Sequence, residues 1–384
     1  MRKILYISGT RADFGLMRNT LRQINEDMCM ELEVIATGMH LMDKFGNSID
    51  EIEDEDFKLH IINQTFKEDS PEAMSIFVGK LIVELTQLIS KIKPDIILLL
   101  GDRGEMLAGA IVGSYLQIPV AQIHGGDISS TVDDDVRHAI TKLSNIHLAA
   151  TDKSASRILQ MGESPKTVFT VGAPGLDSIL DNKKNQDINE LKEKYNIKKD
   201  FAIILQHPVS LEIDQAKDQI KKTLDAVLAT DLQVILIYPN ADAGGRAMIE
   251  VIDEVNNQIN NDNIFKTYKN IPHNDFIGLL SIASVLIGNS SSGMIESSSF
   301  KLPVINIGSR QAGREKSTNV IDLDYDTNEI LKAIKKTQSE EFRNSLNNCV
   351  NPYGEGKAYE KISNILKTIE LNDDLLNKNF NVIK

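Results

Sequence analysis

The sequence predicts an α/β protein built from two Rossmann-like, doubly wound parallel-sheet domains with a cleft between them. Three observations lead to this prediction. The chain has 384 residues, 41% of them hydrophobic, which is enough for two domains at about 150 residues per domain. Short apolar runs of β-forming residues alternate with segments of helical periodicity. The alternation stops in a polar stretch near the middle of the chain and then starts again.

The first half of the chain contains six apolar runs that predict strands. They span residues 3–8, 32–37, 95–100, 119–123, 146–150 and 167–171. Between them, helix-spaced apolar residues predict helices over residues 14–26, 71–92, 105–116 and 133–143. Because a covering helix can follow each strand, the strands should be parallel and buried on both faces.

Residues 181–200 predict the crossing between the domains, because Lys, Asn, Asp and Glu crowd together there. Beyond them, strands are predicted over residues 201–205, 233–238, 284–288 and 303–307, and helices over residues 215–229, 246–258, 274–282 and 294–300. We therefore expect one domain over residues 1–180 and a second over residues 200–355. The C-terminal segment 356–384 begins with an amphipathic stretch, and it can either complete the second domain or cross back onto the first.

Composition excludes several classes of protein. A formal net charge of −13 argues against a nucleic-acid surface. The longest purely aliphatic run, residues 96–100, is far shorter than the ~18 residues of a membrane span, and the N-terminus lacks the long apolar core of a secretion signal. Cys29 and Cys349 stand alone, outside any disulfide framework or zinc-ligand spacing. We expect a soluble, cytoplasmic protein with no nucleic-acid or membrane partner and no metal.

The loop after the first strand, residues 8–13, is a candidate anion site. Ligands of open α/β sheets bind beyond the carboxyl ends of the strands. The backbone N–H groups of this small-residue turn and the guanidinium of Arg11 can bind an anion, so Arg11 and Asp13 are candidate substrate-binding residues. The loop lacks the Gly-x-Gly-x-x-Gly pattern of dinucleotide oxidoreductases. Alternatively, Asp13 caps the helix and Arg11 is solvated.

The loop at residues 286–293 predicts a diphosphate site in the second domain. Ser290 and Ser291 place hydroxyl and N–H groups where a strand turns into a helix. Glu296, one turn into that helix, can accept hydrogen bonds from a ribose diol, and Arg310 adds a cation nearby. The alternatives are a serine helix cap with a packing glycine and a surface ion pair for the arginine.

Titratable side chains gather at the ends of two further strands of the first domain. Asp102 and Arg103 follow the most apolar strand, His124 follows the next one, and Asp133 opens a helix. Convergent carboxylates and imidazoles are what acid/base chemistry requires, so Asp102, His124 and Asp133 are candidate catalytic residues. The acids at residues 133–135 can instead be first-turn residues that favour the helix dipole.

His207 and Asn240 occupy loops after two strands of the second domain. Pro208 ends regular structure after His207, so the imidazole is expected on a loop that faces the cleft, and His207 is a fourth candidate catalytic residue. Asn240 lies in the corresponding loop of the next strand. A hydrogen-bonded loop histidine and a turn-forming asparagine are the alternatives.

Eight short motifs follow one another between about residue 3 and residue 320. They are Gly-Thr-Arg-Ala-Asp at 9–13, Gly-Asp-Arg at 101–103, His-Gly-Gly-Asp at 124–127, the acidic helix start and Arg-His-Ala-Ile-Thr-Lys at 133–142, Gln-His-Pro at 206–208, Pro-Asn-Ala-Asp-Ala-Gly at 239–244, Gly-Asn-Ser-Ser at 288–291 and Arg-Gln-Ala-Gly-Arg at 310–314. In this order they resemble the hydrolysing UDP-N-acetylglucosamine 2-epimerases of sialic-acid and legionaminic-acid pathways. The resemblance implies a GT-B-like fold and a homodimer or homotetramer.

The resemblance also implies roles for the candidate residues. Asp102 and Asp133 would lie near the sugar as acid/base groups, with Asp133 the first candidate for proton transfer, and His207 would lie near the diphosphate. The phosphates and their surroundings would be held by Arg11, Arg103, Ser290, Ser291 and Arg310. Glu296 would bind the ribose, and Asn240 would support the nucleotide.

Two departures from related patterns carry information. His124 stands where the sialic-acid members have the glutamate of a Glu-Gly-Gly motif, a candidate catalytic group, so the exact sugar and one proton-transfer role stay open. Non-hydrolysing epimerases carry Gly-Thr-Arg-Pro-Glu and His-Val-Glu-Ala-Gly in the corresponding loops. Ala12-Asp13 and His124-Gly125-Gly126 replace them here, which favours the hydrolysing branch.

The expected reaction converts UDP-N-acetylglucosamine to N-acetylmannosamine and UDP through a 2-acetamidoglucal, without metal or redox cofactor, in nonulosonic acid biosynthesis. Departure of the nucleotide makes the hydrogen at carbon 2 removable, and water then adds across the double bond. The same chemistry on UDP- or GDP-N,N'-diacetylbacillosamine is the near alternative. More distant alternatives are a non-hydrolysing 2-epimerase, a GT-B glycosyltransferase and a non-catalytic nucleotide-sugar sensor.

Overall fold

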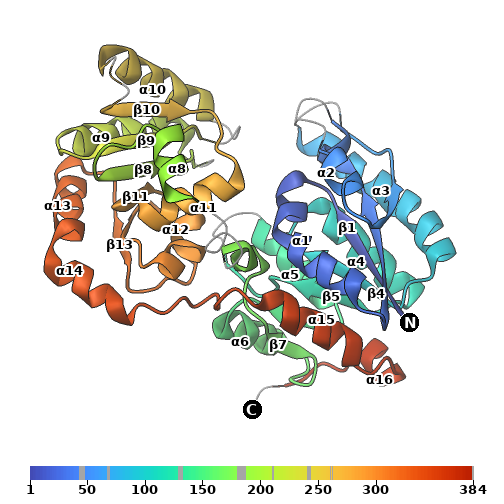
Figure 1. Ribbon diagram of the computed structural model, residues 1–384. Helices are drawn as coiled ribbons and strands as arrows, with labels where there is room; N and C mark the ends of the chain where they lie inside the picture. Colours follow the sequence, from blue (N-terminus) through green and yellow to red (C-terminus); the bar gives the residue numbers. More distant parts are fainter. Residues whose placement is uncertain are drawn as a thin grey trace. The chain divides into compact units, whose positions relative to one another are not determined.

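The chain forms two units, each built on its own parallel sheet (Figure 1). The computed structural model describes residues 1–42, 48–66, 70–128, 133–179, 187–209, 212–239, 244–259, 261 and 263–382. The first unit comprises Met1–Ser178 together with Tyr353–Lys384, and the second comprises Ile179–Pro352. The C-terminal segment thus belongs to the first unit, which the sequence left open.

The first unit is built on a parallel sheet with the strand order β3-β2-β1-β4-β5-β6-β7. The strands are β1 (Arg2–Ser8), β2 (Met30–Ala36), β3 (Lys58–Ile61), β4 (Ile96–Leu100), β5 (Val120–Ile123), β6 (Ile146–Ala149) and β7 (Val168–Thr170). All six predicted strands are confirmed. Strand β3 was not predicted, because this edge strand is half exposed and lacks a continuous apolar run.

Helices cover both faces of this sheet. They are α1 (Arg11–Glu26), α2 (Asp50–Glu53), α3 (Pro71–Ile92), α4 (Gly104–Leu116), α5 (Asp133–Leu143), α6 (Asp152–Gln160), α15 (Ala358–Thr368) and α16 (Asp373–Leu376), with 3-10 turns η1 (Gly38–Leu41) and η3 (Pro174–Leu176). Alternate residues of β1 point to opposite cores: Ile4 and Tyr6 pack with α1 and α15, and Leu5 and Ile7 pack with α3 and α4. The predicted doubly wound arrangement is therefore confirmed.

Helix α3 is the most apolar long helix of the first unit. Its segment Glu72–Ile92 is long and apolar enough to cross a membrane by length and composition alone, with a mean hydropathy of 1.5. Phe77, Leu81, Leu85 and Ile89 follow one another at helical spacing and are buried in the core against the sheet. Packing thus accounts for this buried row only, because just 22% of the apolar window is buried and Ile76 and Val83 are exposed.

The second unit repeats the design with the strand order β10-β9-β8-β11-β12-β13. Its strands are β8 (Phe201–Leu205), β9 (Gln233–Ile237), β10 (Phe265–Tyr268), β11 (Val285–Gly288), β12 (Val304–Ile307) and β13 (Val320–Leu323). Its helices are α8 (Ile188–Lys194), α9 (Ala216–Leu228), α10 (Gly245–Ile259), α11 (His273–Ile282), α12 (Ser292–Ile295), α13 (Thr327–Gln338) and α14 (Glu340–Ser345), with 3-10 turns η4 (Ile213–Gln215), η5 (Ser297–Phe300) and η6 (Leu346–Asn348). The four predicted strands are confirmed, and the two strands that were not predicted, β10 and β13, are the sheet edges.

The predicted helix over residues 294–300 is wrong in its form. One turn of α-helix, α12, is followed by the separate 3-10 turn η5. The three consecutive serines at 297–299 explain the break, because serine hydroxyls compete for backbone partners. Ser297 Oγ donates to the carbonyl of Gly293 at 2.6 Å. Glu296 therefore lies at the end of a short turn and not inside a long helix.

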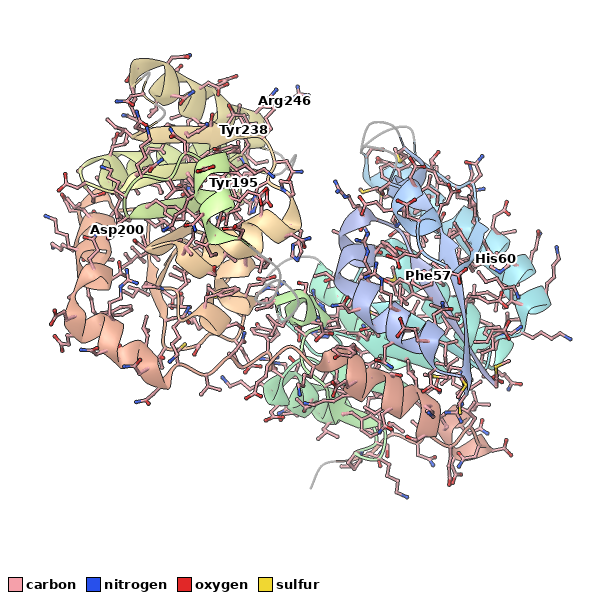
Figure 2. All side chains as sticks on the ribbon, in the orientation of Figure 1. Phe57, His60, Tyr195, Asp200, Tyr238 and Arg246 are labelled. Atoms are coloured by element: carbon pink, nitrogen blue, oxygen red, sulfur yellow. The ribbon has the colours of Figure 1, made fainter. Side chains whose placement is uncertain are left out.

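Helix α8 is fixed within the second unit by Tyr195, which Figure 2 labels. The Tyr195 hydroxyl donates to Asp275 at 2.6 Å, and its ring lies 5.2 Å from that of Tyr268. Residues 187–194 therefore pack with the second unit. Residues 181–186, the first part of the predicted crossing, lie outside the described residues.

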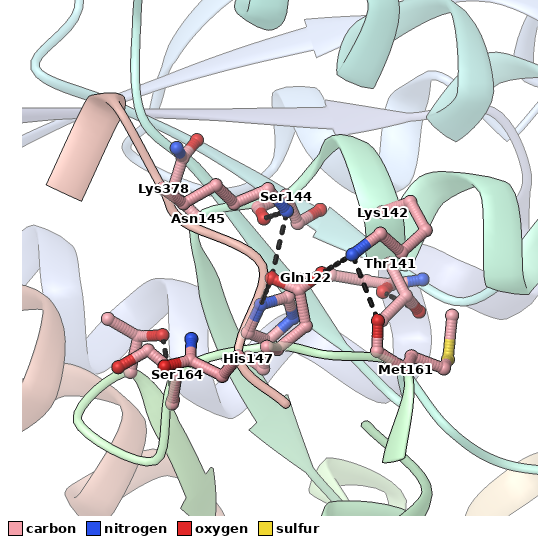
Figure 3. A network of polar contacts seen from close by, with 12 residues as sticks. Gln122, Thr141, Lys142, Ser144, Asn145, His147, Met161, Ser164 and Lys378 are labelled. Carbon is pink, nitrogen blue, oxygen red and sulfur yellow. Dashed lines mark hydrogen bonds and ion pairs between the residues drawn. The ribbon is translucent and has the colours of Figure 1, made fainter. Parts of the chain in front are cut away.

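The C-terminal segment is fastened to the first unit at two places. At the start of α15, the Asp177 carboxylate accepts from the backbone N–H groups of Ala358 and Tyr359 at 2.8 and 3.0 Å. Further on, Lys378 donates to the Ser144 carbonyl at 2.6 Å (Figure 3). It also donates to the Glu163 carboxylate at 2.9 Å. Lys142 and the buried His147 contact the same carboxylate. We call Glu163, Lys142, His147 and Lys378 the tail cluster.

The strand orders locate a topological switch point in each unit. In the first unit the chain reverses its direction of progress between β1 and β4, and in the second between β8 and β11. Open α/β sheets bind ligands beyond the carboxyl ends of the strands at such points. The loops that begin at Gly9 and Gly101 flank the first switch point, and those that begin at Gln206 and Asn289 flank the second.

Candidate active site

The loop after β1 is shaped by Asp13. Thr10 is the N-cap of α1, and Thr10 and Asp13 form a capping box. The Asp13 carboxylate accepts from the N–H groups of Gly9 and Thr10 at 3.0 and 2.9 Å, from the Thr10 hydroxyl at 3.1 Å and from Ser8 Oγ. Burial raises the pKa of Asp13 to about 6. The structure thus places Asp13 in the capping role that the sequence offered as the alternative.

Arg11 points away from this buried cluster. Its side chain is 64% exposed, and its Nε lies 2.5 Å from a carboxylate oxygen of Glu51. Arg18 contacts the other oxygen of that carboxylate at 3.0 Å. The position of Arg11 thus agrees with the alternative prediction that it is solvated, and its described contact is with Glu51 and not with Asp102.

Glu105 is a buried carboxylate that sequence reasoning did not single out. It is fully buried beneath the loops that contain Gly9 and Gly38, and Arg103 Nε contacts it at 3.3 Å. A Cβ added at Gly9 would lie 2.6 Å from the Glu105 carboxyl carbon, and one at Gly38 would lie 2.9 Å from its Oε1. The carboxylate therefore positions Arg103 and requires glycine in both loops.

Gly9→Ala is expected to lower the free energy of unfolding by about 1–3 kcal/mol, because the new methyl group overlaps the buried Glu105 carboxyl. Gly15→Ala is the matched control, since nothing lies within 4 Å of its added Cβ and the residue is in α1. The control should raise the free energy of unfolding by up to about 1 kcal/mol. Urea denaturation followed by circular dichroism measures both. Equal stability of Gly9→Ala and wild type would contradict the predicted overlap.

Arg137 of α5 contacts acidic residues after β4, after β5 and in α5 itself. This guanidinium is buried, and it contacts the Asp102 carboxylate, the Asp134 carboxylate at 2.5 Å and the Asp127 carbonyl at 3.0 Å. Burial alone lowers the pKa of Arg137, but the charges of Asp102, Asp127 and Asp134 outweigh it and raise that pKa. Asp102 is thereby held at the carboxyl edge of the sheet as half of an ion pair.

Gln122 fixes the same edge from within β5. Its amide donates to the carbonyls of Gly101 and Arg137 at 3.1 and 3.2 Å, and its oxygen accepts from Thr141 at 2.7 Å. Sequence reasoning missed this residue and gave Arg137 no role of its own. The available signal was a glutamine inside a strand that was predicted to be buried on both faces, since a buried polar group needs partners.

His124 lies immediately after β5 with its ring against Asp127. The Nδ1 atom is 2.8 Å from Asp127 Oδ2, and the His124 side chain is 16% exposed. The end of β5 thus carries an imidazole beside a carboxylate, and the end of β4 carries Asp102. This arrangement can donate and accept protons.

Two sequence-predicted residues cannot be compared with the structure. Asp133 begins α5, but its side chain lies outside the described residues. Asn240 belongs to residues 240–243, which also lie outside them.

In the second unit, Asn289 joins three loops at the switch point. Its side chain accepts from the N–H of His207 at 2.7 Å and donates to the His207 carbonyl at 2.9 Å. Its own carbonyl accepts from Arg310 at 3.1 Å and from Gln311 at 3.0 Å. The structure therefore brings His207 and Arg310 together, and Asn289 is the residue that does so. Burial, assisted by the charge of Arg310, lowers the pKa of His207 to about 4, so the imidazole is neutral near pH 7.

Ser290, Ser291 and Glu296 lie beside this junction. Ser290 is buried, and its Oγ accepts from the N–H of Ser292 at 3.3 Å. Ser291 is the N-cap of the one-turn helix α12, and Glu296 ends that turn and is buried. Because α12 has a single turn, any attraction for an anion comes from local N–H and hydroxyl groups together with Arg310, and not from a long helix dipole.

Comparison with known proteins gives consistent results along the whole chain. A family model described as UDP-N-acetylglucosamine 2-epimerase matches residues 22–367. A Legionella pneumophila protein named UDP-N,N'-diacetylbacillosamine 2-epimerase (hydrolyzing) is 41% identical over 380 residues, which cover 98% of this chain and 99% of the relative. A Campylobacter jejuni protein named GDP/UDP-N,N'-diacetylbacillosamine 2-epimerase (hydrolyzing) is 35% identical and is matched over 99% of this chain and 98% of its own length.

The fold is also that of solved structures. The crystal structure of UDP-GlcNAc 2-epimerase from Neisseria meningitidis bound to UDP-GlcNAc matches with a TM-score of 0.80 at 18% identity. The match covers 95% of this chain and 99% of that one. The predicted GT-B-like, two-domain fold class is thereby confirmed.

Proposed function

Because the chain belongs to the UDP-N-acetylglucosamine 2-epimerase family, we propose that it is a hydrolysing 2-epimerase, which inverts carbon 2 of a nucleotide-linked 2-acetamido sugar and releases the nucleotide. One observation carries this proposal above the others. Two acid/base groups lie at the ends of the neighbouring strands β4 and β5: Asp102, which contacts Arg137, and His124, which contacts Asp127. They occur in a chain that matches a named hydrolysing 2-epimerase over its full length.

The first candidate substrate is UDP-N,N'-diacetylbacillosamine. The Legionella relative carries this sugar nucleotide in its name, and the Campylobacter relative carries it with GDP as an alternative. UDP-N-acetylglucosamine is the second candidate, because the family description names it. His124, where sialic-acid members have glutamate, supports placing the chain with the diacetamido enzymes.

The proposed reaction has two steps. In the first, the bond between carbon 1 and the diphosphate oxygen breaks, its electron pair leaves with UDP, and a base of the first unit takes the proton from carbon 2. In the second, water adds a hydroxyl to the resulting unsaturated sugar at carbon 1 and a proton returns to carbon 2 on the opposite face. Asp102, Asp133 and His124 are the proposed proton-transfer groups.

The second unit is proposed to bind the nucleotide. Ser290, Ser291, His207 and Arg310 would bind the diphosphate, and Glu296 and Asn240 would bind the ribose and support the base. The neutral His207 can donate one hydrogen bond without adding charge, while Arg310 supplies the cation that stabilises the leaving diphosphate. In the first unit, Asp13 would hold the loop after β1 in shape, and Arg11 and Arg103 would supply cations for the anion.

We further propose a cytoplasmic location, a homodimer or homotetramer, and a place in nonulosonic acid biosynthesis. The free Cys29 and Cys349 fit a reducing compartment. Sedimentation of the purified chain measures the oligomeric state.

The test is to incubate the protein with each candidate sugar nucleotide in deuterated water, without an acceptor, and to follow the mixture by NMR. We expect nucleoside diphosphate, a free sugar inverted at carbon 2 and deuterium at that carbon, with UDP-N,N'-diacetylbacillosamine turned over fastest. A product without deuterium at carbon 2 would contradict elimination and hydration. An intact substrate, or turnover that depends on an acceptor, would point to a sensor or to a glycosyltransferase.

A further inference from the structure

We propose that Asp127 is a positioning residue for His124 and that Ser154 holds the Asp127 carboxylate for this task. The proposal rests on the proposed function, because it concerns the proton-transfer role of His124 in the same site. It adds a chain of hydrogen bonds that runs from Ser154 in α6 through Asp127 to His124, at the proposed reacting edge of the first unit.

The loop after β5 leaves His124 little freedom. His124 has a φ of +62°, in the left-handed region that a non-glycine residue adopts only where its surroundings require it. A Cβ added at Gly126 would lie 2.3 Å from the Ser154 carbonyl, and one at Gly125 would lie 2.6 Å from Gln122 Oε1. Both glycines are therefore needed for the turn to fit against α6 and β5.

The Asp127 carboxylate connects the imidazole to α6. Asp127 Oδ2 lies 2.8 Å from His124 Nδ1, and Asp127 Oδ1 accepts from Ser154 Oγ at 2.6 Å. Ser154 is itself held by Thr151, the N-cap of α6, whose hydroxyl contacts Ser154 Oγ at 3.0 Å. Asp127, Ser154 and Thr151 are all buried. The two carboxylate oxygens thus have separate partners, the partly exposed His124 and the buried Ser154.

This contact fixes the tautomer of His124. An ionised carboxylate can only accept hydrogen bonds, so Nδ1 carries the proton and Nε2 carries the lone pair. Nε2 then takes a proton, and the positive charge that forms is stabilised by the Asp127 carboxylate. Without Asp127, either nitrogen can carry the proton, and the ring loses its fixed orientation.

The loop backbone has supports that do not depend on the carboxylate. Arg157 donates to the Gly126 carbonyl at 2.9 Å, Arg137 donates to the Asp127 carbonyl at 3.0 Å, and the His124 N–H donates to Leu148 of β6 at 3.2 Å. Asp127→Asn leaves these three hydrogen bonds in place. We therefore expect this variant to fold.

The experiment compares the kinetics of Asp127→Asn, His124→Ala and the double variant. The Asp127→Asn substitution is expected to lower kcat about 100-fold with KM within about threefold of wild type. The double variant should be no slower than His124→Ala alone, because Asp127 acts only through the imidazole. Asp152→Asn, an exposed acid in the first turn of α6, is the matched control and should keep wild-type kcat. Full activity of Asp127→Asn, or losses that multiply in the double variant, would overturn the proposal.

A second measurement covers the case in which Asp127→Asn does not fold. Long-range ¹H–¹⁵N NMR of wild-type protein with ¹⁵N-labelled histidine reports the tautomer of His124, assigned with His124→Ala. A proton on Nδ1 supports the proposed hydrogen bond from His124 to Asp127, and a proton on Nε2 alone refutes it. Failure of the proposed function has a different signature, since the wild type would then leave both candidate sugar nucleotides intact whatever the tautomer.

Discussion

Asp102→Asn is expected to lower kcat about 100-fold or more, the usual effect of removing a positioned acid/base group. The asparagine amide has nearly the shape of the carboxylate but cannot take up a proton. Steady-state kinetics with the preferred sugar nucleotide measures the change. Thermal unfolding should show that the fold is retained, because Arg137 still contacts Asp134 and the Asp127 carbonyl.

Asp134→Asn is the matched control for Asp102→Asn. Asp134 and Asp102 contact the same guanidinium, so each substitution removes one negative charge from Arg137. A smaller loss of kcat in Asp134→Asn, below about tenfold, would assign Asp102 a role in proton transfer beyond its ion pair. Equal losses in the two variants would show that Asp102 acts only by holding Arg137.

Glu163→Gln is expected to lower the free energy of unfolding by about 3 kcal/mol, the cost of breaking a buried ion pair from one side. The Glu163 side chain is 2% exposed and is the common partner of Lys142, His147 and Lys378 in the tail cluster. Its loss leaves the half-buried Lys378 without its anion and weakens the attachment of the C-terminal segment. Urea denaturation at pH 7 measures the change.

The pH dependence of this effect follows from the pKa of Glu163. Burial by itself raises that pKa, but the hydrogen bonds from His147, Lys142 and Lys378 outweigh burial and lower it to about 2. The carboxylate therefore contributes its full stability above its ordinary pKa of 4.5 and loses the contribution as pH falls toward 2. The difference between wild type and Glu163→Gln should shrink over the same range.

The control for the tail cluster is Glu31→Gln. Glu31 pairs with Lys58 at 3.4 Å on the surface of the same unit, with 38% and 56% of the two side chains exposed. An exposed pair of this kind contributes less than about 1 kcal/mol. If Glu31→Gln and Glu163→Gln destabilised the protein equally, the tail cluster would have no special part in holding the C-terminal segment.

Local patterns were sufficient to predict the central strands of both sheets. Runs such as Ile96–Leu100 are apolar at every position because the strand is buried on both faces, and that burial is visible in the sequence. The edge strands β3, β10 and β13 have one side near solvent, so their residues alternate or mix and resemble loop sequence. The prediction of one helix over residues 294–300 was wrong for a related reason, because Ser297 and Ser299 also accept hydrogen bonds from the distant residues Asn319 and Asn351.

The candidate site was predicted in part. Asp102, His124, His207, Ser290 and Arg310 stand at strand ends, as expected from the rule that ligands bind beyond the carboxyl edge. The sequence allowed either a binding or a structural role for Asp13 and Arg11. In the structure, the Asp13 side chain lies in the capping box, and the Arg11 side chain pairs with Glu51. No site role was predicted for Arg137, Asp127 and Asn289. Their roles come from contacts with residues that are distant in the sequence.

The sequence by itself determined the fold class, the family and the strand-end loops that carry polar groups, because burial and loop position leave local traces. Only the tertiary structure decided which of those groups touch. Asp102 meets Arg137 across 35 residues, His207 meets Asn289 across 82, and Lys378 meets Glu163 across 215. Such contacts depend on strand order and on the return of the C-terminal segment to the first unit, and neither leaves a local pattern in the chain.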